Sequence, residues 1–352
     1  MFHKSILLTI ALIVVGWANG WSQDIHYSQF YNAPLQLNPA LTGVFSGDLR
    51  VQGNYRYQWN NVPVRYRTFS VVVDKKFIRC GGRSSFIAAG LGLNNDRAGD
   101  TRLSWNDINL NASYTKYLSK GFFLTLGGRA AMAQRKFDSE RLRLGEHFNT
   151  TSGAYDPDII PVDRFSRTSH SFMDLSVGVN FHWQELDRFE RFDYKEERSK
   201  IDFGLGIMHL NKPDQSFIED EIVPLYRRLS IYAQGVLQIG NPLDLVAGIT
   251  GQFQGPYREY VAMGGLRVHL DRSPGKQLAI QLGIGYRFDK NRDAYYPNFQ
   301  LEYNAFRIGF SHDINFSDFN VATLRNGGPE ISFRYVFKKV CPVPSRRFCP
   351  II

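Results

Sequence analysis

The sequence predicts an all-β protein, a transmembrane antiparallel up-and-down β-barrel of about fourteen strands. Residues 49–59 alternate between apolar or aromatic side chains and polar or charged ones, which gives a strand one oily face and one wet face. This pattern recurs roughly every two dozen residues to the end of the chain. Aromatic residues make up 14% of the sequence, and barrels place such residues in girdles at both membrane interfaces.

The individual strands are expected where alternating segments are bounded by Gly, Pro, Asn or clusters of charge. In 170–183 and in 278–288, every second residue is apolar and the residues between are mostly polar or small. Crossing an apolar band about 25 Å tall at roughly 40° takes about ten residues per strand, and these segments fit. The expected strands are 49–59, 67–74, 84–93, 105–118, 122–135, 170–183, 201–210, 229–239, 243–254, 260–270, 278–288, 296–302, 306–313 and 330–337.

The lengths of the connections provide an independent test, because bacterial barrels have short periplasmic turns and longer outer loops. Short links follow the fourth, eighth and twelfth segments and long links follow the fifth, seventh and thirteenth, as an even strand number requires. The link 184–200 is long and charged where a periplasmic turn is expected, so it is either a docking surface or a sign of a misplaced strand. The short links are 119–121, 240–242 and 303–305; the long links are 136–169, 211–228 and 314–329.

Two other fold classes are weighed against the barrel. A soluble, exported β-sandwich or propeller would also have regular short strands, but its oily faces would have to pack against each other, with more polar residues at mid-strand. A helical membrane protein is excluded, because no segment approaches about 20 continuous apolar residues.

Export is predicted from residues 1–22, which have the composition of a secretory signal peptide. Lys4 precedes an apolar run over 6–15, and cleavage is expected after Gly20 or Ser22. The formal net charge of +9 is spread through strands and loops, so no basic patch dominates. Together with export, this argues against a nucleic-acid partner.

The three cysteines are Cys80, Cys341 and Cys349, and their odd number leaves at least one unpaired within the chain. In an oxidising compartment, Cys341 and Cys349 could close a small loop in the tail, while Cys80 with either of them is the rival pairing. Spacing does not decide between these pairings.

Motifs of catalysis or cofactor binding are weak. Gly204-Leu205-Gly206 begins like a dinucleotide fingerprint, but the third glycine is missing, and glycine at alternate strand positions fits a crowded barrel wall. Residues 94–100 resemble a calcium loop but lack its terminal Glu, and Asx turns explain them equally well. We therefore expect no cofactor, no metal and no catalytic residues, the alternative being a Ser/His pair assembled across strands.

The stretch after the signal does not alternate like a strand, and it resembles the opening of the PorP/SprF family of type IX secretion membrane proteins. The likeness spans nearly the whole mature chain. It rests on Asp24–Leu35 (DIHYSQFYNAPL), Leu37–Gly43 (LNPALTG), Asn54-Tyr55-Arg56 with Gln58-Trp59, Asn95–Gly99, Phe137-Asp138-Ser139 with Leu142, His209–Pro213, Ser311–Ile314 and Glu330-Ile331-Ser332.

The resemblance implies an outer-membrane barrel that works with other type IX secretion components, without enzymatic activity. Relatives that resemble SprF support the export of a large adhesin to the surface of gliding bacteria, so a secreted client protein is an implied partner, bound through its C-terminal sorting domain. Outer-membrane lipid is the other expected partner. The alternative function is a pore or transporter for small solutes or hydrophobic ligands.

Four segments are therefore expected: the signal peptide 1–22, a periplasmic or plug segment 23–47, the barrel 48–338 and a Cys-containing tail 339–352. The second segment precedes the first strand, so it should lie in the periplasm, either plugging the barrel or lying beneath it. Loops 94–104, 136–169 and 211–228 are expected to form the outer platform for a client. The residues predicted to form the plug or to bind partners are Tyr27, Gln29, Phe30, Tyr31, Asn38, Pro39, Asn95 and Asp96, with Asn32 as a further polar candidate.

Overall fold

The structure is a computed structural model. The predicted signal peptide and all three cysteines lie outside the residues that it describes. These residues are 24–59, 65–77, 85–119, 121–142, 147–149, 154–156, 165–185, 198–273, 275–288, 294–317 and 323–338.

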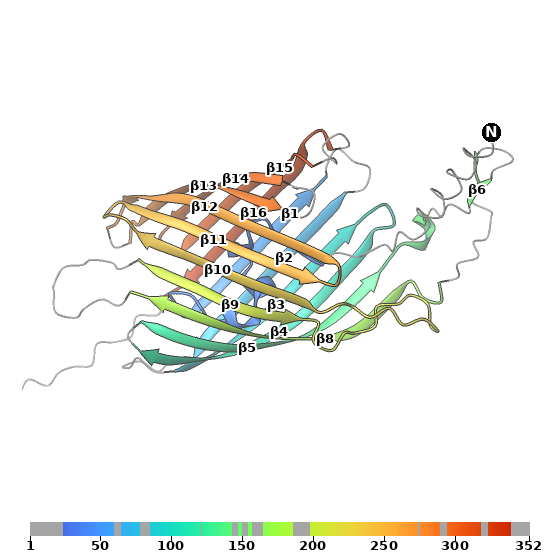
Figure 1. The fold of residues 1–352 in the computed structure, drawn as a ribbon, viewed down its shortest axis with the longest axis horizontal. Coiled ribbons are helices and arrows are strands. Elements are labelled where there is room, and N and C mark those ends of the chain that lie inside the picture. Colours follow the sequence, from blue (N-terminus) through green and yellow to red (C-terminus); the bar gives the residue numbers. More distant parts are fainter. Residues whose placement is uncertain are drawn as a thin grey trace, which may run out of the picture.

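Fourteen strands form one closed barrel in which every neighbouring pair is antiparallel (Figure 1). The predicted fold and strand number are confirmed. A separate sheet of two very short strands, β6 (Phe148–Asn149) and β7 (Ala154–Tyr155), lies in the link between β5 and β8. The barrel strands are β1 (Leu49–Gln58), β2 (Tyr66–Phe77), β3 (Phe86–Ala98), β4 (Leu103–Ser119), β5 (Phe122–Lys136), β8 (Ser169–Gln184), β9 (Lys200–Met208), β10 (Arg228–Gln238), β11 (Leu243–Gln254), β12 (Tyr257–Asp271), β13 (Leu278–Phe288), β14 (Ala294–Tyr303), β15 (Phe306–Asn315) and β16 (Asn326–Phe337).

The pairing of β1 with β16 closes the barrel. Leu49 lies opposite Phe337 and Arg56 lies opposite Glu330, so eight residues of each strand are paired in register. An aromatic residue, Phe337, ends the last strand. The closure leaves no unpaired edge at this seam, which is what allows a sheet to cross a membrane.

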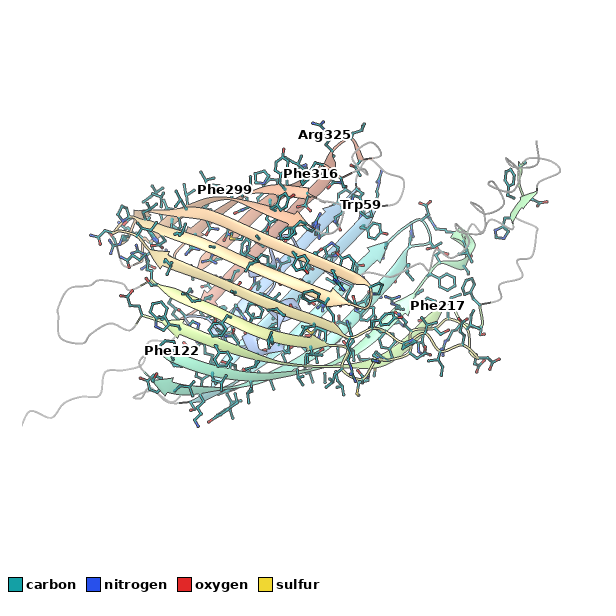
Figure 2. All side chains as sticks on the ribbon, viewed as in Figure 1. Trp59, Phe122, Phe217, Phe299, Phe316 and Arg325 are labelled. Carbon is teal, nitrogen blue, oxygen red and sulfur yellow. The ribbon has the colours of Figure 1, made fainter. Side chains whose placement is uncertain are left out.

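The two faces of the wall have opposite chemistry. On β4, Ile108 and Leu110 are 58% and 64% exposed, whereas Asn109 and Asn111 between them are 2% and 3% exposed. Figure 2 shows the same outward direction for aromatic side chains such as Phe299, which is 40% exposed. Apolar residues thus face outward and polar residues face the lumen, as in a barrel that lies in a bilayer. Among the described residues, no helix has the length and hydropathy needed to span a membrane.

The ends of the barrel differ in their connections. The turn end carries Leu49, Phe337 and the links 120–121, 239–242 and 304–305, and the loop end carries the links 137–168 and 209–227. By the usual sidedness of bacterial barrels, the turn end is periplasmic and the loop end faces outward.

The expectation of one outer loop is wrong, whereas a link whose position the sequence left in question is found where it was predicted. The expected outer loop 94–104 is mostly strand, because β3 and β4 continue their pairing as far as Ala98 opposite Leu103 and leave a turn of four residues. The long link after β8 lies where the sequence placed it, since β8 ends at Gln184 and β9 begins at Lys200. Residues 186–197 of that link lie outside the described part of the chain.

Candidate functional site

Residues 24–47, called the plug segment from here on, lie inside the barrel. They include η1 (Phe30–Asn32), α2 (Pro34–Leu37) and η2 (Pro39–Leu41), which appear in blue within the wall in Figure 1. Hydrogen bonds join the segment to β1, β2, β4, β8, β9, β10, β13, β15 and β16. Contacts on all sides of the lumen mean that the segment blocks its middle.

The sequence left open whether the plug segment plugs the barrel or lies beneath it, and the segment lies inside the lumen. Its first described residue, Asp24, contacts His209 and Arg228 at the loop end. The segment then runs through the lumen toward the turn end, where its last residues lead into β1. The segment therefore spans the lumen from one end to the other, and its beginning lies on the outward side.

Local sequence explains the three short helical turns. Pro34 and Pro39 begin α2 and η2, at positions where the missing N–H of proline leaves no hydrogen bond unmade. Asn38 caps η2 by accepting a backbone hydrogen bond of 2.8 Å. Gly43 follows with a φ of +75°, and a Cβ there would lie 2.4 Å from Ala88 Cβ, so this turn requires glycine.

Two carboxylates of the wall hold the start of the plug segment. Ser28 N and Gln29 N donate to the Glu330 carboxylate at 2.8 and 3.0 Å. Ser28 Oγ donates to Asp313 Oδ1 at 2.8 Å. All four residues are buried, so these bonds supply acceptors for backbone N–H groups that water does not reach.

Two arginines of the wall balance these carboxylates. Arg56 Nη2 lies 2.7 Å from Asp313 Oδ2 and Arg56 Nε lies 3.7 Å from Glu330 Oε2. Arg287 Nη1 contacts both Asp313 Oδ2 and Ser28 Oγ at 3.0 Å. Ser28, Arg56, Arg287, Asp313 and Glu330 are called the Ser28 cluster below. Because the cluster is buried, removing one charge would leave its partners without compensation.

Asn38 occupies a niche between three strands on the far side of the lumen. Its Nδ2 lies 2.9 Å from Val179 O, 3.1 Å from Leu205 O and 3.1 Å from Tyr232 Oη. The residue is completely buried, so the side-chain amide depends on these wall groups for its hydrogen bonds.

Glycines in the wall make the niche possible. A Cβ at Gly178 would lie 1.9 Å from Asn38 Oδ1, and a Cβ at Gly206 would lie 2.9 Å from Leu37 O. A Cβ at Gly127 would meet the plug backbone at 2.5 Å. The interpretation of alternate glycines as room in a crowded wall is confirmed at Gly206.

At the loop end, Asp24 lies between two basic groups. Its Oδ2 is 2.8 Å from His209 Nε2 and 2.9 Å from Arg228 Nη1, and His209 Nδ1 lies 3.0 Å from Asp174 Oδ1. Burial opposes ionisation of Asp24, but the charges of Arg228 and His209 outweigh it and hold the pKa of Asp24 below its usual range. Burial also opposes protonation of His209, but Asp24 and Asp174 raise the pKa of His209 above its ordinary value.

An ion pair holds the other end of the plug segment. Arg50 Nε and Nη2 donate to the two oxygens of Asp74 at 2.8 Å each, a two-pronged pairing. Asp74 Oδ2 also accepts from Gly43 N at 2.7 Å, and Arg50 Nη2 donates to Leu41 O at 3.2 Å.

The six predicted residues of the plug segment come together in the lumen, and of the two on β3 only Asp96 faces it. Tyr27 Oη donates to Ser70 Oγ at 3.0 Å, and Gln29 Nε2 donates to Ser311 Oγ at 3.0 Å. Phe30 packs in the main apolar cluster of the lumen, which also contains Leu35, Leu37, Leu41, Tyr232, Val236, Val246, Val261, Met263 and Tyr296, with Tyr31 packed against it. The six residues are Tyr27, Gln29, Phe30, Tyr31, Asn38 and Pro39.

Asn95 and Asp96 lie on β3, and the register puts their side chains on opposite faces of the wall. Asp96 accepts from Thr68 Oγ1 at 2.6 Å, and Asn95 Nδ2 donates to Asn106 Oδ1. Neither forms a hydrogen bond with the plug segment among the described residues, but Asp96 lines a small cavity at the loop end together with Asp24, Ile25 and His26. The strand position of Asn95 and Asp96 means that the turn chemistry expected for 94–100 does not apply to them.

The charged residues that hold the plug segment are missing from the predicted site. Arg56, His209, Asp313 and Glu330 each lie within a motif that carries the family resemblance. They belong to four different strands or links, so their proximity becomes visible only when the barrel closes. The available signal was a charged side chain within such a motif, which for Arg56, Asp313 and Glu330 stands at an inward-facing strand position.

The described residues contain no group of three or more His, Cys, Asp or Glu side chains arranged to hold a metal ion. The chain thus offers a plugged lumen, with loops and turns at its two ends.

A closed barrel with an outward apolar face and a blocked lumen is the structure of an outer-membrane protein. Residues 19–335 match the family described as "Type IX secretion system membrane protein PorP/SprF", so the chain belongs to this family. It is a type IX secretion membrane component of the outer membrane, and the family is not one of enzymes. No curated protein matches the sequence.

Solved barrels are similar in fold at low identity. The Ralstonia pickettii toluene transporter TbuX is 11% identical, with a TM-score of 0.47 over 87% of this chain and 94% of that one. The Acinetobacter baumannii outer membrane protein Omp33 is 8% identical, with a TM-score of 0.41 over 83% and 98%. The translocator domain of the autotransporter NalP from Neisseria meningitidis is 11% identical, with a TM-score of 0.36 over 88% and 96%.

Proposed function

We propose that this protein is a non-enzymatic helper of type IX secretion, which supports the secretion or surface anchoring of a client protein such as an adhesin used in gliding motility. Its membership of the PorP/SprF family supports the proposal. The observation that carries it is the plug segment, which blocks the lumen and is held there by buried hydrogen bonds to nine strands. With the middle of the lumen blocked, the two ends of the barrel are the surfaces that remain for protein partners, while the apolar outer face contacts lipid.

A pore for small solutes is the competing function. It would need a continuous path through the lumen, whereas Asn38 and Ser28 are fully buried in contact with opposite sides of the wall. The plug contacts therefore favour the helper over the pore.

The first experiment is a gentle detergent pull-down of the tagged protein from native outer membranes, with its partners identified by mass spectrometry. An unrelated tagged barrel at the same abundance is the control. Recovery of type IX components or of a large secreted protein, absent from the control, supports the proposal. Recovery of the barrel alone, together with ion conductance of the purified protein in planar bilayers, overturns it in favour of the pore.

A further inference from the structure

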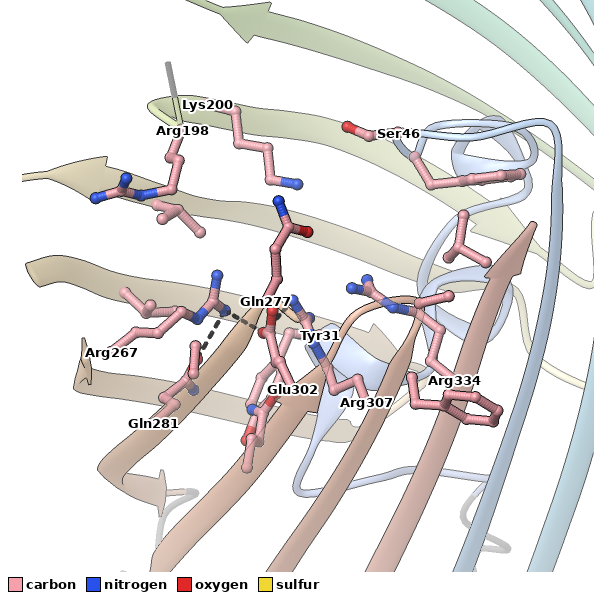
Figure 3. A pocket seen from close by; sticks show the side chains of 18 of the residues that line it. Tyr31, Ser46, Arg198, Lys200, Arg267, Gln277, Gln281, Glu302, Arg307 and Arg334 are labelled. Carbon is pink, nitrogen blue, oxygen red and sulfur yellow. Dashed lines mark hydrogen bonds and ion pairs between the residues drawn. The ribbon is translucent and has the colours of Figure 1, made fainter. Parts of the chain in front are cut away.

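A cavity of about 290 Å³ lies inside the barrel at the turn end (Figure 3). Its apolar part includes plug residues, among them Tyr31, Leu41 and Val44. The rest is basic, since eight Lys or Arg side chains and only three Asp or Glu side chains line it. The cavity reaches the turn residues Arg272 and Asn304, so it faces the periplasmic end. Its lining thus combines an apolar surface with a positively charged one.

Part of this positive charge is already neutralised. Arg50 pairs with Asp74 and Arg198 pairs with Asp244, each at 2.8 Å. Glu302 is shared by two arginines: Arg267 Nη2 lies 3.1 Å from Glu302 Oε1, and Arg307 also contacts that oxygen (Figure 3). The site therefore already holds one carboxylate between two guanidinium groups.

Four cations of the lining have no such partner among the described residues: Lys200, Arg272, Arg334 and Lys338. Arg272 belongs to a turn and Lys338 is exposed, whereas Lys200 and Arg334 are half-buried on strands of the wall. Among the described residues, neither Lys200 nor Arg334 has an acidic group within 4.0 Å of its nitrogen atoms. Figure 3 shows both side chains beside the cavity, with Arg307 between Glu302 and Arg334. This side of the cavity carries net positive charge at a place that the barrel wall shields from bulk water.

Several buried hydrogen-bond donors beside the cavity also lack an acceptor. Gln281 is 0% exposed, and its Oε1 accepts from Arg267 Nη2 at 2.8 Å while its Nε2 has no hydrogen-bond partner among the described residues. Arg267 Nε and Arg307 Nε are also buried donors without a hydrogen-bond partner among the described residues. Some acceptors of the lining, such as Gln52 Oε1 and Gln234 Oε1, also lack a partner, but among the described residues the donors without a partner outnumber them. Because a buried donor without an acceptor is costly, this lining is suited to a ligand rich in acceptors.

We propose that this cavity binds the carboxylate of a polypeptide segment that enters from the turn end, and that Lys200 and Arg334 form ion pairs with this carboxylate. The inference rests on the proposed function, because the segment would belong to a secretion partner. An apolar residue beside the carboxylate would lie on Tyr31 and Leu41. The volume is near the lower limit for ligand pockets and admits the end of a chain rather than a folded domain. Bilayer lipid is separated from the cavity by the wall.

The test is isothermal titration calorimetry of the purified full-length protein with acetyl-Ala-Leu. The same peptide with a C-terminal amide has the same shape without the charge. We expect the carboxylate to bind at least about tenfold more tightly than the amide, and less tightly as salt is raised. Lys200→Gln and Arg334→Gln should each weaken binding by about tenfold, since each removes one charged donor. Neither variant breaks an ion pair among the described residues, so both should fold.

Arg258→Gln, on the exposed loop end of β12, is the matched control and should bind as the wild type does. The heat-dependent shift of the folded barrel on a gel confirms folding of every variant. Equal binding of acid and amide, no binding of either, or unchanged binding by Arg334→Gln overturns the proposal. Binding of decanoate without binding of the peptide also overturns it, in favour of a fatty acid. If the pull-down recovers type IX components while the peptide fails, the cavity assignment alone falls and the proposed function stands.

Discussion

Ser28 Oγ donates to Asp313 Oδ1 at 2.8 Å, although 285 residues separate the two in the sequence. The same carboxylate receives Arg56 from β1 and Arg287 from β13. The plug segment is thereby part of the charge balance of the wall. Displacing the plug segment would take away the Ser28 hydroxyl, which donates to Asp313 and accepts from Arg287. The buried charges of Asp313, Arg56 and Arg287 would then lose this hydrogen-bond partner.

Replacing Asp313 with Asn should destabilise the barrel by about 3 kcal/mol, because it leaves Arg56 and Arg287 buried without their shared counter-charge. Urea unfolding of the protein in detergent micelles measures this change. Asp100→Asn, in the exposed turn after β3, is the control and should change the free energy of unfolding by less than about 0.5 kcal/mol. Equal stability of the two variants would contradict the role given to the Ser28 cluster.

Gly178→Ala should displace Asn38, because the new Cβ would lie 1.9 Å from Asn38 Oδ1. We expect a loss of about 1–3 kcal/mol in stability and a rise in single-channel conductance as the plug segment loosens. Gly264→Ala is a matched control, since a Cβ at that glycine meets nothing within 4 Å. If both variants conduct as the wild type does, Asn38 does not hold the lumen closed.

The contact of Asp24 with His209 should make the stability depend on pH in two directions. The pKa of Asp24 lies below its ordinary value of 3.8, so the stabilisation is present above pH 3.8 and is lost as the pH falls. The pKa of His209 lies above its ordinary value of 6.5, so its stabilisation is full below pH 6.5 and is lost as the pH rises through the folded value. The contribution of the pair should therefore be greatest between these two values.

Urea unfolding at a series of pH values tests this, with His209→Gln and Asp24→Asn as variants. His209→Gln should remove the loss on the alkaline side, and Asp24→Asn should flatten both sides. A pH profile of Asp24→Asn that matches the wild type would show that the pair has no part in the pH dependence.

The start of the mature chain should be accessible from outside the cell, because Asp24 lies at the loop end of the lumen. An epitope inserted between the predicted signal peptide and Asp24 should bind antibody on intact cells. The same epitope in the turn at Lys276, at the opposite end, should bind only after the outer membrane is permeabilised. The reverse labelling pattern would mean that the segment enters from the periplasmic side.

The strands were predictable because each is a local pattern. The alternation of Leu278 to Phe288 can be read from eleven residues, and β13 has these bounds in the structure. The end of β3 was harder to predict, because Asn94 to Asp96 are typical turn residues, and their pairing with β2 on one side and β4 on the other keeps them extended. Tertiary pairing here overrides the local preference.

The plug residues were found by their aromatic and amide character, but their charged partners were not. Arg56 and Glu330 are 274 positions apart, and no local pattern says that they meet. Their meeting depends on the seam between β1 and β16, which is a property of the closed barrel. The basic cavity was missed for the same reason, since Lys200 and Arg334 come from distant strands.

The seam has a consequence for assembly. Arg56 comes from the first strand and Glu330 from the last, and both contact residues that the ribosome makes before either strand. A chain that lacks β16 can satisfy neither Ser28 N nor Gln29 N with this carboxylate. Docking of the N-terminal segment and sealing of the sheet therefore become one late event in folding, dominated by contacts of very long sequence separation. The first residues of the mature chain therefore reach their final position last.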